Sequence, residues 1–168
     1  MRANKTQKLA FLGLFAALAI LMAYIEAILP IQLGIPGVKL GIPNIVIIFV
    51  LYVWNAKNAF AISLVRILVI GLLFGNLYSI LFSLAGALVS FFLMLLLKKC
   101  KFSRLTVSIV GGVSHNVAQL FVASMVVKVY SVLYFLPIMI GAGVLAGTAI
   151  GILSSLMVKK LQASLKCL

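Results

Sequence analysis

The chain alternates between long apolar runs and short polar gaps, and this pattern predicts a series of membrane-spanning helices. The first run, Leu9 to Leu29, has 21 residues. That length is enough to cross a hydrocarbon core of about 30 Å at about 1.5 Å per residue. Pro30 ends this run, and polar or basic gaps separate the later ones. The predicted helices cover residues 9–29, 44–54 or 37–54, 59–74, 79–97, 105–127 and 132–158.

The second apolar run is shorter than the others. It extends from Asn44 to Trp54, only eleven residues, and does not span a bilayer by itself. The preceding segment, Ile31 to Pro43 (IQLGIPGVKLGIP), is rich in Gly and Pro and has little helical periodicity. Either the helix begins earlier, near Gly37, and kinks at Pro43, or the loop folds into the protein. Because non-helical backbone at membrane depth is tolerated where it lines a cavity, we expect a binding site here.

Composition supports a membrane protein with a single domain. Apolar residues make up 65% of the 168 residues and charged residues 9%. Soluble domains carry about 25% charged residues, because their surface faces water. No stretch resembles a linker, so residues 1–168 are predicted to form one all-α bundle of about six transmembrane helices.

The distribution of charge predicts the orientation of this bundle. The chain has fourteen Lys and Arg but one acidic residue, Glu26, and its net charge is +13. An N-terminus inside the cell places eleven cations inside and only Lys39 and Lys128 outside. This bias follows the positive-inside rule, so both termini are predicted to be cytoplasmic and nucleic acid binding is not expected. Cys100 and Cys167 then lie on the reducing side and are interpreted as incidental.

Small residues recur every four positions on two helices. Gly143, Gly147 and Gly151 form one row, which Ser155 continues. Such rows let two helices approach closely. Such rows are contacts inside the bundle, or, for the row on the first helix, a docking surface for a partner membrane protein, and both interpretations stay open. The candidate docking residues on the first helix are Gly13, Ala17, Ala19, Ala23 and Ala27.

Few polar residues lie within the apolar runs, and these are the candidates for ligand binding. An ionisable group at membrane depth requires a partner. For Arg66 this partner is Glu26, a set of backbone carbonyls or a ligand anion. His115 and Gln119 are four residues apart and share a helical face, with Asn116 beside them. The predicted substrate-binding residues are Lys39, Asn44, Arg66, His115, Asn116 and Gln119.

The sequence has no pattern typical of a catalytic or metal site. It contains no Gly-x-x-x-x-Gly-Lys-Ser/Thr loop for ATP and no paired carboxylates for acid–base catalysis. It contains no set of Cys, His and acidic residues with metal-ligand spacing. We therefore expect neither catalysis, nor a metal, nor a cofactor.

The cations Lys39, Arg66 and Lys128 would give an outer pocket a positive potential that suits an anionic ligand.

Three segments resemble a known family. They are LGIPGVKLGIPNIV (33–46), FSLAGALVSFFLM (82–94) and VGGVSHNVAQLF (110–121). Together they resemble the bacterial Gx transporter family, also labelled heptaprenyl diphosphate synthase component I. The resemblance extends over nearly the whole chain, and its most specific part is Gly-Gly-x-x-His-Asn-x-x-Gln. That family is similar in architecture to the substrate-binding S components of energy-coupling factor (ECF) transporters.

The resemblance implies a function and a partner. S components have six helices, a loop after helix one that covers the pocket, and a small-residue strip that docks onto a transmembrane coupling subunit with two ATPases. We therefore expect a substrate-binding subunit for uptake of a vitamin, flavin or isoprenoid precursor across the bacterial cytoplasmic membrane. The alternative is a non-catalytic subunit of isoprenoid or quinone synthesis, or of a membrane redox assembly. A catalytic synthase subunit is not expected, because Glu26 alone cannot build the carboxylate cluster that holds magnesium.

Overall fold

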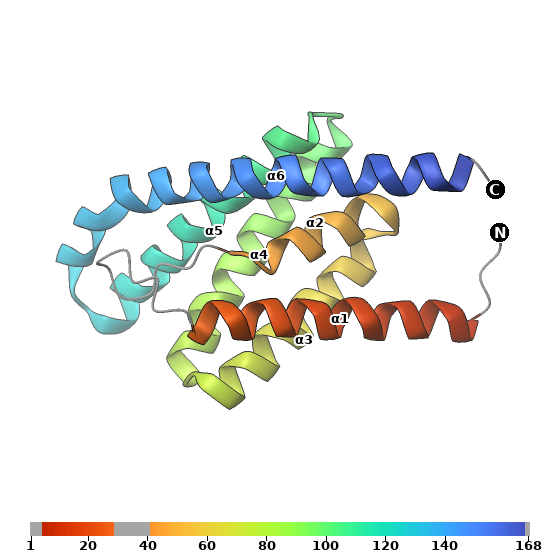
Figure 1. Cartoon of the computed structure of the whole chain (residues 1–168). Coiled ribbons are helices and arrows are strands. Elements are labelled where there is room, and N and C mark those ends of the chain that lie inside the picture. The colour runs from red at the N-terminus through yellow and green to blue at the C-terminus, as the bar shows by residue number, and fades with distance from the viewer. Residues whose placement is uncertain (1–4, 29–40, 167–168) are drawn as a thin grey trace.

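The structure is a computed structural model that describes residues 5–28 and 41–166, and within these ranges it contains helices and no strand. Five of the helices are long and apolar enough to cross a membrane. The predicted all-α, multi-pass fold is therefore confirmed. The elements, shown in Figure 1, are α1 (Lys5–Ile28), α2 (Asn44–Val53), α3 (Ala56–Phe74), α4 (Leu77–Lys99), α5 (Arg104–Val127), the 3-10 helix η1 (Tyr130–Phe135) and α6 (Leu136–Lys166).

Polar residues in the short turns start three of the helices. The Asn55 side chain accepts a hydrogen bond from the Asn58 backbone N–H at the start of α3. Asn76 and Ser79 cap each other reciprocally at the start of α4. The Ser103 hydroxyl accepts from the Thr106 N–H at the start of α5. Such caps satisfy backbone donors that have no partner inside the helix, which explains why the turns can be so short.

The short helix α2 lies at the centre of the bundle. It packs against α1, α3 and α6, and its residues from Val46 to Leu51 are all buried. The helix begins at Asn44, and the residues just before it form a turn in which Gly41 has a φ of +72°. The longer alternative, a helix from near Gly37 that kinks at Pro43, is therefore wrong over residues 41–43. Ten residues rise about 15 Å, half of a bilayer core.

The glycine row on α6 is a contact inside the bundle. A Cβ added at Gly147 would lie 2.7 Å from the Ile109 Cα, and one added at Gly143 would lie 2.7 Å from the Val113 Cα. The Ser108 hydroxyl also donates to the Gly147 carbonyl at 2.7 Å. Close backbone approach of this kind is what rows of small residues permit. The row therefore joins α5 to α6 and is not a free docking surface.

The small residues of α1 divide between two faces. Ala19 is fully buried and Ala23 is 9% exposed, so both contact the rest of the chain and are not accessible to a partner. Phe15 lies on the same side, with its ring centroid 5.4 Å from that of Phe49 in α2. Gly13 and Ala17 are exposed, and a Cβ at Gly13 would meet nothing within 4 Å. Only these two and Ala27, which is exposed in the last turn of α1, remain candidates for docking.

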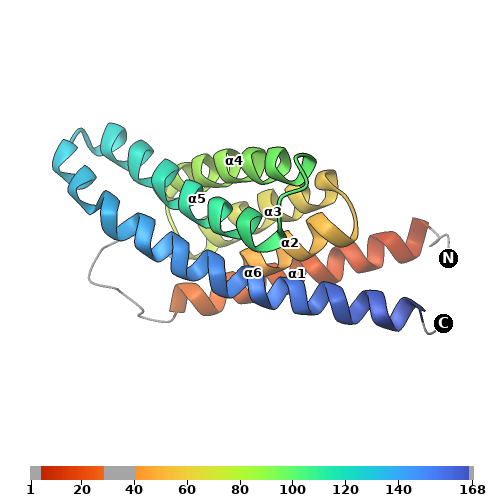
Figure 2. The ribbon, with the colours of Figure 1, turned by 90° about the horizontal axis from the view of Figure 1, so that it is seen from above.

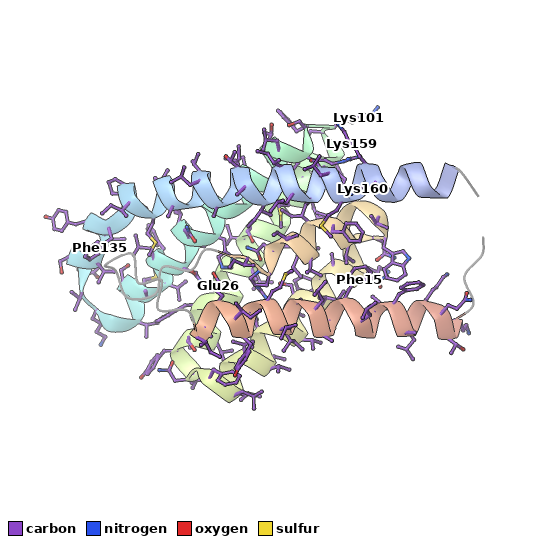
Figure 3. The ribbon with its side chains drawn as sticks, in the orientation of Figure 1. Phe15, Glu26, Lys101, Phe135, Lys159 and Lys160 are labelled. Carbon is purple, nitrogen blue, oxygen red and sulfur yellow. The ribbon has the colours of Figure 1, made fainter. Side chains whose placement is uncertain are left out.

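The connections of the bundle gather at two opposite ends. Figures 1 and 2 place the start of α1, the α2–α3 and α4–α5 turns and the end of α6 toward one end. The α3–α4 turn and η1 lie toward the other end. In Figure 3 the cations Lys101, Lys159 and Lys160 lie toward the first end, whereas Glu26 lies away from them. This arrangement agrees with the sides that the charge pattern assigns, with the basic end as the predicted cytoplasmic end.

Large apolar side chains cover much of the outer surface. Leu9 is 71% exposed, Leu72 76% and Leu145 75%. They lie on three different helices, so the apolar surface surrounds the bundle and does not form one patch. Water-facing surfaces of this kind are rare in soluble proteins, whereas lipid chains cover them without cost. The surface therefore suits a lipid environment.

Candidate functional site

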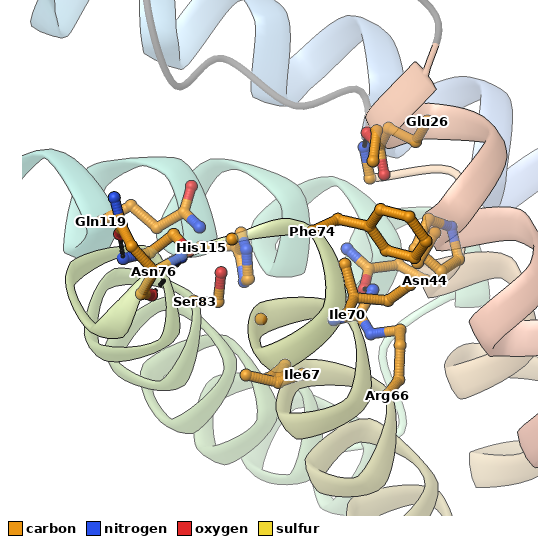
Figure 4. A pocket seen from close by; sticks show the side chains of 17 residues that line it. Glu26, Asn44, Arg66, Ile67, Ile70, Phe74, Asn76, Ser83, His115 and Gln119 are labelled. Atoms are coloured by element: carbon orange, nitrogen blue, oxygen red, sulfur yellow. Dashed lines mark hydrogen bonds between the residues drawn. The ribbon is translucent and has the colours of Figure 1, made fainter.

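A cavity of about 380 Å³ lies at the end of the bundle away from the basic turns. Its volume is in the range of sites for small-molecule ligands. Helices α1, α3, α4 and α5 and the start of α2 form its wall, as Figure 4 shows. The polar residues that line it are Glu26, Asn44, Arg66, Asn76, Ser79, Ser83, His115 and Gln119. Four of the six predicted substrate-binding residues thus meet at one cavity.

Arg66 is the buried cation of this cavity. It lies in the middle of α3 and is 8% exposed. Its Nη1 is 3.5 Å from the Asn44 Oδ1, which is the outer limit for a hydrogen bond and therefore a weak one. Asn44 is the first residue of α2, so the point at which the short helix begins brings its amide to the guanidinium.

Glu26 enters the same cavity from the last turn of α1. Its Oε1 accepts a hydrogen bond from the Gly41 backbone N–H at 2.5 Å. Gly41 has a φ of +72°, and a Cβ there would lie 2.9 Å from the Asn44 Nδ2. This left-handed conformation favours glycine. The carboxylate of Glu26 also interacts electrostatically with Arg66. The sequence pointed to Glu26 only as a partner for Arg66, and the structure makes it part of the cavity wall.

His115 and Gln119 lie one turn apart on α5 and both line the cavity. They face Gly86 of α4, where an added Cβ would lie 2.9 Å from the His115 Cε1 and 2.8 Å from the Gln119 Cγ. The missing side chain at Gly86 therefore makes the space that these two side chains occupy. Sequence reasoning missed this role. The only sign of this role in the sequence was an isolated glycine inside an apolar helical run. Such a glycine often allows close packing against a neighbouring element.

Asn116 lies outside this cavity. It is 5% exposed, and its Nδ2 donates to the Met139 carbonyl of α6 at 3.1 Å. It lines a separate space of about 20 Å³, which is room for about one water molecule. Of the three neighbouring polar residues of α5, His115 and Gln119 thus remain binding-site candidates, whereas Asn116 joins α5 to α6.

Other lining residues come from the α3–α4 connection, which the sequence did not single out. Ile67, Ile70 and Phe74 of α3 supply an apolar wall. Asn76 and Ser79 line the cavity at the turn while they cap α4 through each other. A cavity with an apolar wall and a few polar groups is typical of a small-molecule site.

Lys39, the last of the six predicted substrate-binding residues, lies outside the described residues. Over residues 5–28 and 41–166, no three His, Cys, Asp or Glu side chains come close enough to hold a metal ion.

Comparison with known proteins identifies the family. A search of curated proteins and a search of solved structures found no match. A family model described as heptaprenyl diphosphate synthase component I matches residues 15–157. This range includes every described residue that lines the cavity, from Ala23 to Gln119. The chain is thus a multi-pass membrane protein that belongs to the heptaprenyl diphosphate synthase component I family.

Proposed function

We propose that this protein is the substrate-binding subunit of an uptake system in the bacterial cytoplasmic membrane. The observation that carries the proposal is the buried Arg66 in a cavity of about 380 Å³ among membrane-spanning helices. A cation at membrane depth costs free energy, and such residues mark substrate or ion pathways. The ligand is a small metabolite with an anionic group for Arg66, of the vitamin, flavin or isoprenoid-precursor class.

Movement of the ligand requires a partner in this proposal. The printed sequence has no phosphate-binding loop of the P-loop type, so ATP hydrolysis of that type has to come from another chain. The partner is a transmembrane coupling subunit that carries ATPases. The exposed face of α1 around Gly13 and Ala17 suits its docking, because small residues allow close approach of a second helix.

A second candidate function follows from the family description. It is a non-catalytic accessory subunit of isoprenoid or quinone synthesis, for example of a prenyl diphosphate synthase, or of a membrane redox assembly. The chain has one acidic residue in all, and a magnesium–diphosphate site needs several oxygen ligands. Any prenyl transfer would therefore take place on a carboxylate-rich partner.

Binding measurements with a matched variant test the proposal. The full chain in lipid nanodiscs is titrated with vitamins, flavins and short prenyl phosphates. Arg66→Ala is expected to weaken binding of the ligand that is found by at least about tenfold. Lys57→Ala serves as the control, because Lys57 lies on the same helix, is exposed and is not part of the cavity wall.

Uptake by cells and the proteins that co-purify complete the test. Arg66→Ala and His115→Ala are expected to abolish uptake of that ligand, and ATPases are expected to co-purify with the chain. If no ligand binds and both variants leave uptake unchanged, the proposal is lost. Stable co-purification with a prenyltransferase or a redox enzyme in place of ATPases favours the second candidate.

A further inference from the structure

The cavity contains charged side chains of both signs. Glu26 of α1 and Arg66 of α3 line it together and interact electrostatically. Glu26 is also the only acidic residue of the 168-residue chain. An acidic residue in an apolar helix is costly to bury. Its presence in this wall suggests a role in recognition that a purely anionic ligand does not explain.

Both charges are held at the point where the chain enters α2, one by the turn before the helix and one by its first residue. The Gly41 N–H donates to the Glu26 carboxylate, and the Arg66 guanidinium donates to the Asn44 side chain. A carboxylate offers about four acceptor positions and a guanidinium five N–H donors, so each group can take part in several hydrogen bonds at once. The anchored charges are fixed in position before a ligand arrives, which reduces the cost of ordering them on binding.

The two charges lie on the same side of the cavity. In Figure 4, Glu26, Asn44 and Arg66 gather at one side, and His115 and Gln119 lie at the other. Ile70 lies between the two groups, and the ring of Phe74 lies on the side of Asn44 and Arg66, against Tyr24 of α1. A ligand that fits this pattern has two opposite charges close together at one end. Its body is apolar in the middle and has a hydrogen-bonding group at the far end.

We infer that the ligand is a zwitterion of the amino-acid type, with its anionic group on Arg66 and its ammonium group on Glu26. This inference rests on the uptake function proposed above and deepens it. In a poorly solvated site, an anion alone would be repelled by Glu26 and a cation alone by Arg66. Only a ligand with both charges gains from both side chains. The cavity volume of about 380 Å³ is in the range of sites for small-molecule ligands and has room for an amino acid with a large apolar side chain.

Three matched probes test the charge pattern. L-tryptophan carries both charges on an indole body, tryptamine lacks the carboxylate, and indole-3-propionate lacks the ammonium group. Binding of each radiolabelled probe to the full chain in nanodiscs is measured at pH 7, with empty nanodiscs as the control for partition into lipid. The wild-type chain is expected to bind tryptophan at millimolar or better affinity and at least about tenfold more tightly than either analogue.

Two variants test which side chain of the cavity binds which charge of the ligand. Glu26→Gln is expected to weaken the binding of tryptophan and tryptamine by at least about tenfold and to leave the binding of indole-3-propionate unchanged or make it tighter. Arg66→Gln is expected to weaken the binding of tryptophan and indole-3-propionate and to leave that of tryptamine unchanged. Lys57→Gln, on α3 but outside the cavity wall, is expected to change none. If Arg66→Gln does not fold, the wild-type order of the three probes and the Glu26→Gln pattern decide the result.

The possible failures are distinguishable. Binding of indole-3-propionate as tight as that of tryptophan, with no effect of Glu26→Gln, overturns the zwitterion. In that case, the loss of that binding in Arg66→Gln keeps the uptake function with an anionic ligand. Failure of all three probes to bind below about 10 mM overturns the zwitterion inference. The proposed function itself is lost only if the Arg66→Ala and ligand-panel tests described above also fail.

Discussion

At the scale of single residues, the shape of the cavity depends on positions that carry no functional group. Gly86 has neither charge nor hydrogen-bonding side chain, yet His115 and Gln119 occupy the space that its side chain would fill. Gly41 is equally important, because its left-handed backbone brings its N–H to Glu26. A binding site inside a close-packed bundle is thus made by small residues as much as by polar ones.

Substitution of Gly86 tests this interpretation. Gly86→Ala is expected to destabilise the protein by about 1–3 kcal/mol, because the new methyl group forces His115 and Gln119 out of their positions. Gly13→Ala is the matched control, since its Cβ would meet nothing within 4 Å; it is expected to stabilise α1 by about 0.5–1 kcal/mol. Unfolding in mixed micelles, followed by the fluorescence of Trp54, measures both. Equal stability of the two variants would contradict the packing role of Gly86.

At the scale of helices, the contact between α5 and α6 is a close approach of two backbones. The backbones approach so closely that Gly143 and Gly147 face main-chain atoms of α5. The hydroxyl of Ser108 and the amide of Asn116 add hydrogen bonds to carbonyls of α6. Because α5 also carries His115 and Gln119, this contact sets the position of one side of the cavity.

A large side chain in the glycine row should separate these helices. In Gly147→Leu the added atoms meet the backbone of Ser108 and Ile109 at 2.7–2.8 Å, which cannot move as a flexible side chain does. We expect a loss of at least about 3 kcal/mol, the upper end for overpacked cores, together with loss of ligand binding. A Cβ added at Gly141 on the same helix would meet nothing within 4 Å, so Gly141→Leu should behave like the wild type. Size-exclusion profiles and denaturation midpoints compare the two, and similar profiles would contradict the proposed contact.

At the scale of the whole molecule, the arrangement of the bundle separates a basic end from the end that holds the cavity. The native Cys100 lies in the α4–α5 turn and is exposed, whereas Ser131 lies in η1 at the opposite end and is also exposed. The positive-inside rule assigns the basic end to the cytoplasm. On this prediction the cavity opens toward the outside of the cell, which the proposed uptake function requires.

Cysteine labelling in intact cells checks this orientation. In a Cys167→Ser background, Cys100 is expected to react with a membrane-impermeant maleimide only after the cells are permeabilised. In a Ser131→Cys variant that also carries Cys100→Ser and Cys167→Ser, the new cysteine is expected to react without permeabilisation. The reverse pattern would turn the cavity toward the cytoplasm and rule out capture of a ligand from outside.

Prediction from sequence succeeded where the physics is local. The length and composition of each apolar run determine whether it can span a bilayer, so five spans followed from the pattern. The last helix differs most from its predicted bounds of 132–158, because residues 130–135 form the 3-10 helix η1 and α6 extends from Leu136 to Lys166. The rarity of ionisable or strongly polar groups in these runs directed attention to Arg66, His115 and Gln119. It also directed attention to Asn116, and nothing in the chain distinguishes an amide that faces a cavity from one that binds a neighbouring carbonyl.

The sequence by itself determined that the chain is an all-helical membrane protein, with a short second helix and few polar groups at depth. The tertiary structure decided which of those groups meet. It brought Glu26 of α1 and Arg66 of α3 to one cavity, turned Asn116 toward α6, and buried Ala19 and Ala23 inside the bundle. The reason is that hydrophobicity acts residue by residue along the chain. The rotation of each helix about its axis depends on contacts between residues far apart in sequence.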